Sequence, residues 1–163
     1  VLIHLLGLTA VQFGWINSVA LLTISPLAGM VNGRLVQRFK GRNMMCFGFA
    51  LILLSGLILL LSETFFGLSM VSVVIALFIL NFAVGFVWVN AFSAAMTPFG
   101  HIAGYAATLY AFIQYSGAAL ISSGLAYFPD HSARPLALVW IVVSMMGLFI
   151  LKFATAKEAN SSA

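Results

Sequence analysis

The chain has 163 residues, of which 63% are hydrophobic and 6% are charged. This composition excludes a water-soluble globular domain, because so few polar side chains cannot cover its surface, and it favours a lipid bilayer as the solvent. The net charge of +4 at pH 7 comes from cations that flank apolar stretches, so it indicates a membrane protein and no nucleic-acid partner.

Continuous apolar runs predict helices, because backbone groups in lipid must form hydrogen bonds within the protein. The predicted fold class is all-α membrane, with about five transmembrane helices. In chain order, we expect spans at residues 13–36, 43–62, 68–96, 102–128 and 135–153. Residues 1–8 are apolar but too short to span, so we expect them to end a preceding helix of a longer protein. Residues 154–163 form a predicted cytoplasmic tail.

Proline, glycine and serine residues mark the predicted helix boundaries. Pro98 and Gly100 are expected to break the chain after the third span. Pro135 suits the first turn of the fifth span, and Ser132 is a plausible cap for it. Pro26 lies inside the first span and predicts a kink, either for packing or for function.

The cations lie unevenly between alternate loops. Four follow the first span (Arg34, Arg38, Lys40 and Arg42), two lie at the C-terminal end (Lys152 and Lys157), and Arg134 is alone in the fourth loop. The positive-inside rule therefore predicts that the first loop and the C-terminus are cytoplasmic. This places the chain in the cell inner (plasma) membrane as a multi-pass protein.

Polar and aromatic residues recur at helical spacing within two spans. Asn81, Gly85 and Trp88 share a face of the third span, and Tyr110 and Gln114 share a face of the fourth. A broad, lightly polar surface of this kind suits a drug-binding cavity. Contact with lipid or with neighbouring helices remains the alternative for both faces.

Small residues spaced four apart form a ladder on the first span, at Ser25, Gly29 and Gly33. Such ladders allow the backbones of two helices to approach closely, so we expect this one to pack against a neighbour.

No Asp, Glu, Lys or Arg lies in the middle of any predicted span. A proton-driven protein with this sequence would therefore carry its proton on a group outside these residues. Patterns for nucleophilic catalysis, phosphate binding, dinucleotide binding and zinc binding are also absent, so we expect no enzyme activity, no cofactor and no metal site.

The stretch from Gly29 to Arg42, GMVNGRLVQRFKGR, resembles the basic loop of the major facilitator superfamily, G-x-x-x-D/N-R-x-G-R. Asn32, Arg34, Arg38 and Arg42 are the residues that this resemblance assigns to a cytoplasmic gate. Simple anchoring to the lipid surface is the alternative role for the same cations. Together with QFGW at residues 12–15, NAFSAAMTPFGHIAG at residues 90–104, and Gln114, the chain is similar to the C-terminal half of Bcr/CflA-type drug-resistance transporters.

This resemblance implies that residues 1–163 form a C-terminal transmembrane half-domain, with the eighth to twelfth helices of a twelve-helix fold. It implies a secondary active transporter that exports small molecules or drugs by proton antiport with alternating access. The implied partners are the lipid bilayer, the N-terminal half of the same protein, a small-molecule substrate and protons. The alternative function is a non-transporting integral membrane subunit of a larger complex.

Overall fold

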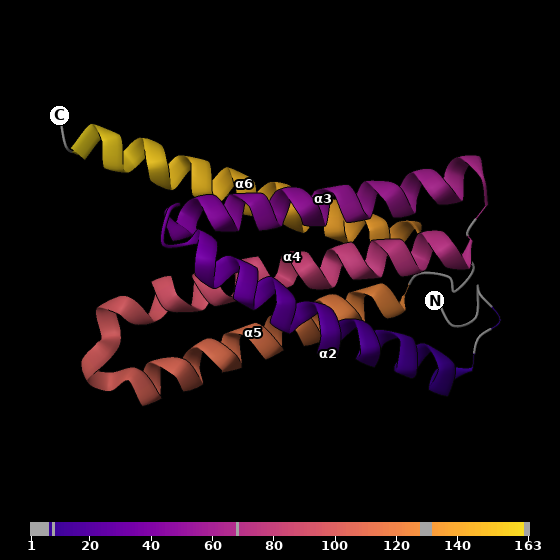
Figure 1. The fold of residues 1–163 in the computed structure, drawn as a ribbon, viewed down its shortest axis with the longest axis horizontal. Coiled ribbons are helices and arrows are strands. Elements are labelled where there is room, and N and C mark those ends of the chain that lie inside the picture. The colour runs from indigo at the N-terminus through magenta and orange to yellow at the C-terminus, as the bar shows by residue number, and fades with distance from the viewer. Residues whose placement is uncertain (1–6, 8, 68, 128–131, 162–163) are drawn as a thin grey trace.

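The structure is a computed structural model that describes residues 7, 9–67, 69–127 and 132–161. Every regular element in these residues is helical, which confirms the predicted all-α class. The elements are α2 (Ala10–Leu35), α3 (Gly41–Phe65), α4 (Met70–Met96), the short 3₁₀ helix η1 (Thr97–Ile102), α5 (Ala103–Ala126) and α6 (Arg134–Ser161) (Figure 1). The predicted end of a preceding helix at residues 1–8 lies outside the described residues, apart from Gly7.

Four helical segments of the described chain are long and apolar enough to cross a membrane. They are Val11–Leu35, Gly41–Phe65, Met70–Ala126 and Arg134–Phe153, and the third contains both α4 and α5, joined through η1. The chain is therefore a multi-pass membrane protein whose apolar helices are surrounded by lipid.

Local chemistry explains where the helices begin and turn. Thr9 caps α2 through a reciprocal capping box, in which its hydroxyl accepts from the Gln12 N–H and its own N–H donates to the Gln12 side chain. Pro26 is accommodated within a single continuous α2. Gly67 has a φ of +74°, a left-handed conformation that glycine adopts without strain, and it lies in the turn between α3 and α4.

Four of the helices lie side by side in the order α6–α3–α4–α2, because α3 packs against both α4 and α6 while α2 packs against α4 (Figure 1). One end of this layer carries the loop at residues 36–40 together with η1, and we call it the basic end. The other end carries the turn between α3 and α4 and the start of α6, and we call it the opposite end.

Two glycines of α3 allow its backbone to come close to the backbones of α4 and α6. A Cβ at Gly48 would lie 3.0 Å from the Ala83 carbonyl oxygen of α4, and a Cβ at Gly56 would lie 3.1 Å from the Ala137 carbonyl oxygen of α6. Within the described residues, the packing expected for the ladder on α2 is not seen at its two glycines, since a Cβ at Gly29 or Gly33 would meet no atom within 4 Å. Close approach therefore involves α3, with α4 on one side of it and α6 on the other.

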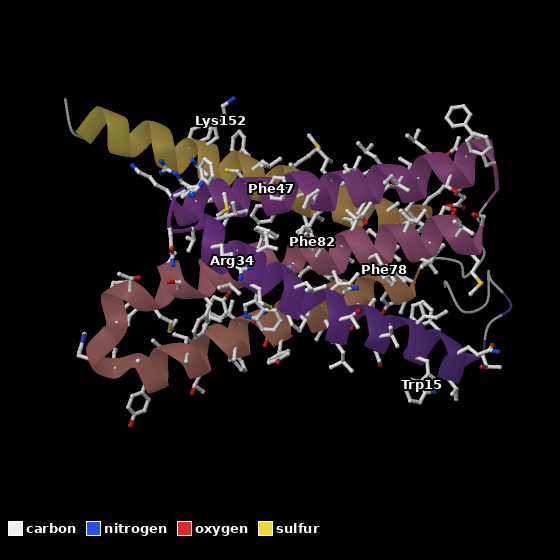
Figure 2. All side chains as sticks on the ribbon, in the orientation of Figure 1. Trp15, Arg34, Phe47, Phe78, Phe82 and Lys152 are labelled. Carbon is white, nitrogen blue, oxygen red and sulfur yellow. The ribbon has the colours of Figure 1, made fainter. Side chains whose placement is uncertain are left out.

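Two apolar clusters fill the layer. At the basic end, Phe86 is fully buried with Ala28 and Met44, and the rings of Phe47 and Phe82 pack against it at centroid distances of 5.4 and 5.2 Å. Figure 2 shows Phe47 and Phe82 in the region between α3 and α4, and Trp15 and Lys152 on the outside of the layer. The second cluster joins α3, α4 and the start of α6 around Leu59, Val73 and Ala137.

The helix α5 is the exception to this packing. None of its residues is buried, and its contacts with the other described helices are made mainly through η1 and the end of α4. Phe99 within η1 leaves helical geometry, with φ of −112° and ψ of 23°, so the chain changes direction there. The break predicted at Pro98 and Gly100 is thus confirmed.

Candidate functional site: a buried amide pair at the basic end

Two asparagine side chains form a buried side chain–side chain hydrogen bond between helices, the one such bond in the described part of the chain. Asn32, near the end of α2, and Asn90, near the end of α4, are only 2% and 6% exposed. The Asn90 Nδ2 donates to the Asn32 Oδ1 at 2.7 Å and also to the Phe86 carbonyl oxygen of its own helix, at 2.7 Å. Because both groups are removed from lipid and water, breaking their contact leaves a buried acceptor unsatisfied.

The start of α3 completes this site. A Cβ at Gly41 would lie 3.1 Å from the Asn90 Oδ1, so the glycine allows α3 to begin directly beside the amide. The ring of Phe86 lies one helical turn before Asn90 and closes the site towards the apolar cluster. Three helices therefore meet at one polar contact, and a change in the angle of α2 against α4 would have to break it.

The predicted gating residues are only partly brought together. Asn32 lies at the centre of the site, whereas Arg34 and Arg38 are exposed on the loop side of α2. Arg42 is half-buried at the start of α3 and lines a cavity that Asn90 also lines. Arg34 and Arg38 are thus separate from the Asn32–Asn90 pair, whereas Arg42 lies close to it.

The predicted substrate residues divide between two helices. On α4, Gly85 is buried, Trp88 is 47% exposed, and the half-buried Asn81 donates its Nδ2 to the Leu77 carbonyl oxygen at 2.8 Å. On α5, Tyr110 and Gln114 are half-buried. Their assignment to a substrate cavity stays a prediction.

Tyr110 is the predicted substrate residue with the best-defined surroundings. Its ring packs edge-on against Phe92 of α4, with the centroids 5.3 Å apart. It also lines an apolar cavity of about 300 Å³ between the end of α4, η1 and α5, together with Phe99, Tyr105 and Ile113. The other four predicted substrate residues do not line this cavity.

A second polar contact closes the opposite end. The Ser132 hydroxyl donates to the Glu63 Oε1 at 2.7 Å and accepts from the Arg134 N–H at 3.1 Å, so it joins the end of α3 to the start of α6. The Arg134 Nε lies 3.9 Å from the same carboxylate oxygen, but the Arg134 side chain is 59% exposed, which makes this ion pair weak. The Glu63 Oε2 is buried without a hydrogen-bond partner in the described structure.

Replacement of Ser132 by alanine is expected to lower the free energy of unfolding by roughly 1.5–3 kcal/mol, the value of a hydrogen bond to a charged group. Within the described residues, the Glu63 carboxylate would lose its one short hydrogen bond. Detergent-micelle unfolding followed by circular dichroism measures the effect. Ser123→Ala, at an exposed position of α5, is the matched control. Equal unfolding midpoints for the two variants would contradict the structural role of Ser132.

Sequence reasoning missed the role of Asn90, because an asparagine in an apolar run gives no information about which helix it faces. The same applies to Ser55, whose hydroxyl donates across the interface to the Ala76 carbonyl oxygen of α4 at 2.7 Å. The sequence does contain one signal for this pairing, because Asn32 and Asn90 each lie near the C-terminal end of their helix.

Comparison with known proteins gives no match: no protein-family model fits the chain, and no curated protein or solved structure is similar to it.

Proposed function

We propose that the chain is part of a secondary active transporter that exports small molecules or drugs by proton antiport with alternating access. The observation that carries this proposal is the exposure of the residues of α5. This helix bears Tyr110, Gln114 and several hydroxyl groups, yet none of its residues is buried. Polar side chains at membrane depth face a water-filled cavity or another protein element, so α5 is suited to line a wet substrate cavity.

The surroundings of Gln114 support this role. Within the part of the chain that the structure describes, its amide has no hydrogen-bond partner. An amide without a hydrogen-bond partner costs free energy when it is in contact with lipid. In contact with water or a substrate, the same amide can form hydrogen bonds. The N-terminal half implied by the resemblance to the major facilitator superfamily would form the other wall of the cavity.

The basic end fits the gate of such a transporter. The Asn32–Asn90 contact holds α2 against α4 there. Opening a passage between these helices would replace this hydrogen bond by hydrogen bonds to water. The net free-energy cost of that exchange is small, so the contact can break and form again in each cycle. The excess of Lys and Arg in this loop supports a cytoplasmic position for it, with the chain in the inner (plasma) membrane. The antiported proton would be carried by a titratable group outside the described spans.

Substitution of Asn81 or Gln114 by alanine is expected to change resistance to individual drugs by roughly 3–10-fold, up for some compounds and down for others, because one hydrogen bond is worth about 0.5–1.5 kcal/mol. The measurement is the growth of cells that express the intact protein, with a panel of compounds of different shape and charge. Membrane levels of each variant, measured by immunoblot, are expected to stay at the wild-type value.

Phe112→Ala is the matched control for Gln114→Ala, because Phe112 is 68% exposed and lies on the opposite side of α5 at almost the same depth. The control is expected to leave the drug profile unchanged. Unaltered profiles for Asn81→Ala and Gln114→Ala would contradict the cavity assignment. If expression of the wild-type protein gives no resistance or proton-coupled flux, and the chain purifies with other membrane proteins, the non-transporting subunit is the correct function.

A further inference from the structure

The cavity of about 300 Å³ between the end of α4, η1 and the first half of α5 has a wall of unusual composition. On the α5 side, its wall follows one face of the helix, with Tyr105, Ala106, Leu109, Tyr110 and Ile113. Met96 lines it at the end of α4, and Phe99 and Ile102 line it at η1. Its volume is at the lower end of the range for small-molecule sites, so it has room for a small ligand or for one ring of a larger ligand.

Three aromatic side chains line this cavity. Phe99 belongs to η1, and Tyr105 and Tyr110 belong to α5. The ring of Tyr110 is held by its edge-on contact with Phe92 of α4. A bound ring can pack offset or edge-on against such side chains, and the thioether of Met96 adds a polarisable group that packs well against ring edges. The wall is therefore suited to an aromatic ligand.

The wall of the cavity carries no formal charge. Among the described residues, none of the Asp, Glu, Lys, Arg and His side chains lines it. His101 of η1 is exposed and lines a neighbouring space that shares Ile102 and Tyr105 with this cavity. A charged group in the cavity would lose its hydration without gaining a partner, which costs far more free energy than the removal of a neutral group from water. The ligand that fits is therefore uncharged.

A lipid chain is the other apolar molecule that could enter this cavity, because Tyr105 is 83% exposed and Ile113 is 63% exposed. A hydrocarbon chain that moves from the bilayer into the cavity leaves surroundings that are equally apolar, so the hydrophobic effect gives it no net gain. An aromatic ligand gains ring–ring contacts that lipid chains do not offer. The three rings therefore favour an aromatic ligand over a lipid chain.

We propose that this cavity binds an uncharged, flat aromatic group of the small molecules that the chain would export. The ring enters between α4 and α5 and packs against Phe99, Tyr105 and Tyr110, and the rest of the ligand extends through the exposed side of the cavity. The role as a substrate site rests on the proposed function, whereas binding of the ring follows from the cavity alone. Because the cavity lies beside η1 at the basic end, the ligand enters from the side of the membrane that carries the basic loop.

The test is photoaffinity labelling of the purified intact protein in a non-ionic detergent with a naphthyl diazirine, followed by mass spectrometry of the labelled peptides. Labelling is expected at residues 95–113. Naphthol and decanol are the competitors, because they have the same number of carbon atoms and one hydroxyl each but differ in shape and aromaticity. Naphthol is expected to displace the label at a mole fraction in the micelles at least about tenfold lower than decanol does, since only naphthol gains ring–ring contacts.

Tyr110→Leu removes one ring and keeps the wall apolar. It is expected to raise the amount of naphthol needed for half displacement by about fivefold, without changing the circular dichroism spectrum or the elution volume. Tyr110→Phe keeps the ring and is expected to behave as the wild type. Tyr115→Leu is the matched control, because Tyr115 is a 67% exposed tyrosine of the same helix outside the cavity wall, and it is expected to leave displacement unchanged.

Equal displacement by naphthol and decanol would overturn the proposal, since the cavity would then be a general apolar surface. Labelling spread over the exposed helices, with no part that naphthol displaces, would also overturn it, as would equal losses in Tyr110→Leu and Tyr115→Leu. Naphthol displacement at residues 95–113 in a protein that gives cells no drug resistance would support the binding site and contradict the proposed function. Absence of naphthol displacement in a protein that does give resistance would contradict the binding site and leave the proposed function in place.

Discussion

Gly48→Leu is expected to lower the free energy of unfolding by roughly 1–3 kcal/mol and occasionally more, as for other overpacked interiors. A Cβ at this position would lie 2.6 Å from the Val87 Cγ2, 3.2 Å from the Phe86 Cβ and 3.0 Å from the Ala83 carbonyl oxygen. The valine methyl could rotate away, but the backbone oxygen could not. The helices α3 and α4 would therefore have to separate along the most extensive interface of the layer.

The measurement is the midpoint of unfolding in mixed micelles, followed by circular dichroism. Gly117→Leu, in α5, is the control, because a Cβ at Gly117 would meet no atom within 4 Å. We expect this control to unfold close to the wild-type midpoint. Similar midpoints for both leucine variants would mean that α3 and α4 are not in close contact at Gly48.

Asn90→Leu is expected to lower the free energy of unfolding by about 1–3 kcal/mol, because it leaves the buried Asn32 Oδ1 without its donor. Asn32→Leu is expected to cost less, since the Asn90 Nδ2 keeps its hydrogen bond to the Phe86 carbonyl oxygen. The double leucine variant is expected to be more stable than the sum of the single losses predicts. The coupling energy should be about 0.6 kcal/mol and at most about 1.7 kcal/mol, the range for polar contacts between membrane helices.

A double-mutant cycle in the same unfolding assay measures this coupling. Asn17→Leu is the control substitution, because Asn17 is an exposed asparagine on the same helix as Asn32. We expect no coupling between Asn17 and Asn90. Additive losses for Asn32→Leu and Asn90→Leu would show that the two amides act independently, and the gate proposed at the basic end would lose its central contact.

The sequence predicted the helices well because lipid imposes a simple requirement. Backbone hydrogen bonds must be internal, so an apolar run of sufficient length predicts a helix without knowledge of its neighbours. The breaks at Pro98 and Gly100 follow from local backbone chemistry alone. The Ser132 cap was also predictable, and its hydroxyl does accept from the N–H at the start of α6.

The packing of the helices could not be predicted in the same way. Glycine ladders occur on several helices. Only the three-dimensional arrangement shows that a Cβ at Gly48 or Gly56 would meet a neighbouring helix, whereas a Cβ at Gly29 or Gly33 would meet no described atom within 4 Å. The pairing of Asn32 with Asn90 is equally a result of topology, since 58 positions separate the two residues. In an apolar chain, polar residues mark sites, but their partners depend on which helix faces lie together.

The turn at Phe99 has a mechanical consequence for the fold. Because α5 has 24 residues, it extends about 36 Å from η1 at a rise of about 1.5 Å per residue. A rotation of about 10° about the backbone dihedrals of Phe99 would displace the C-terminal end of α5 by about 6 Å. No buried side chain of α5 would have to leave its neighbours during this swing, so the hinge can move while the layer of four helices stays rigid.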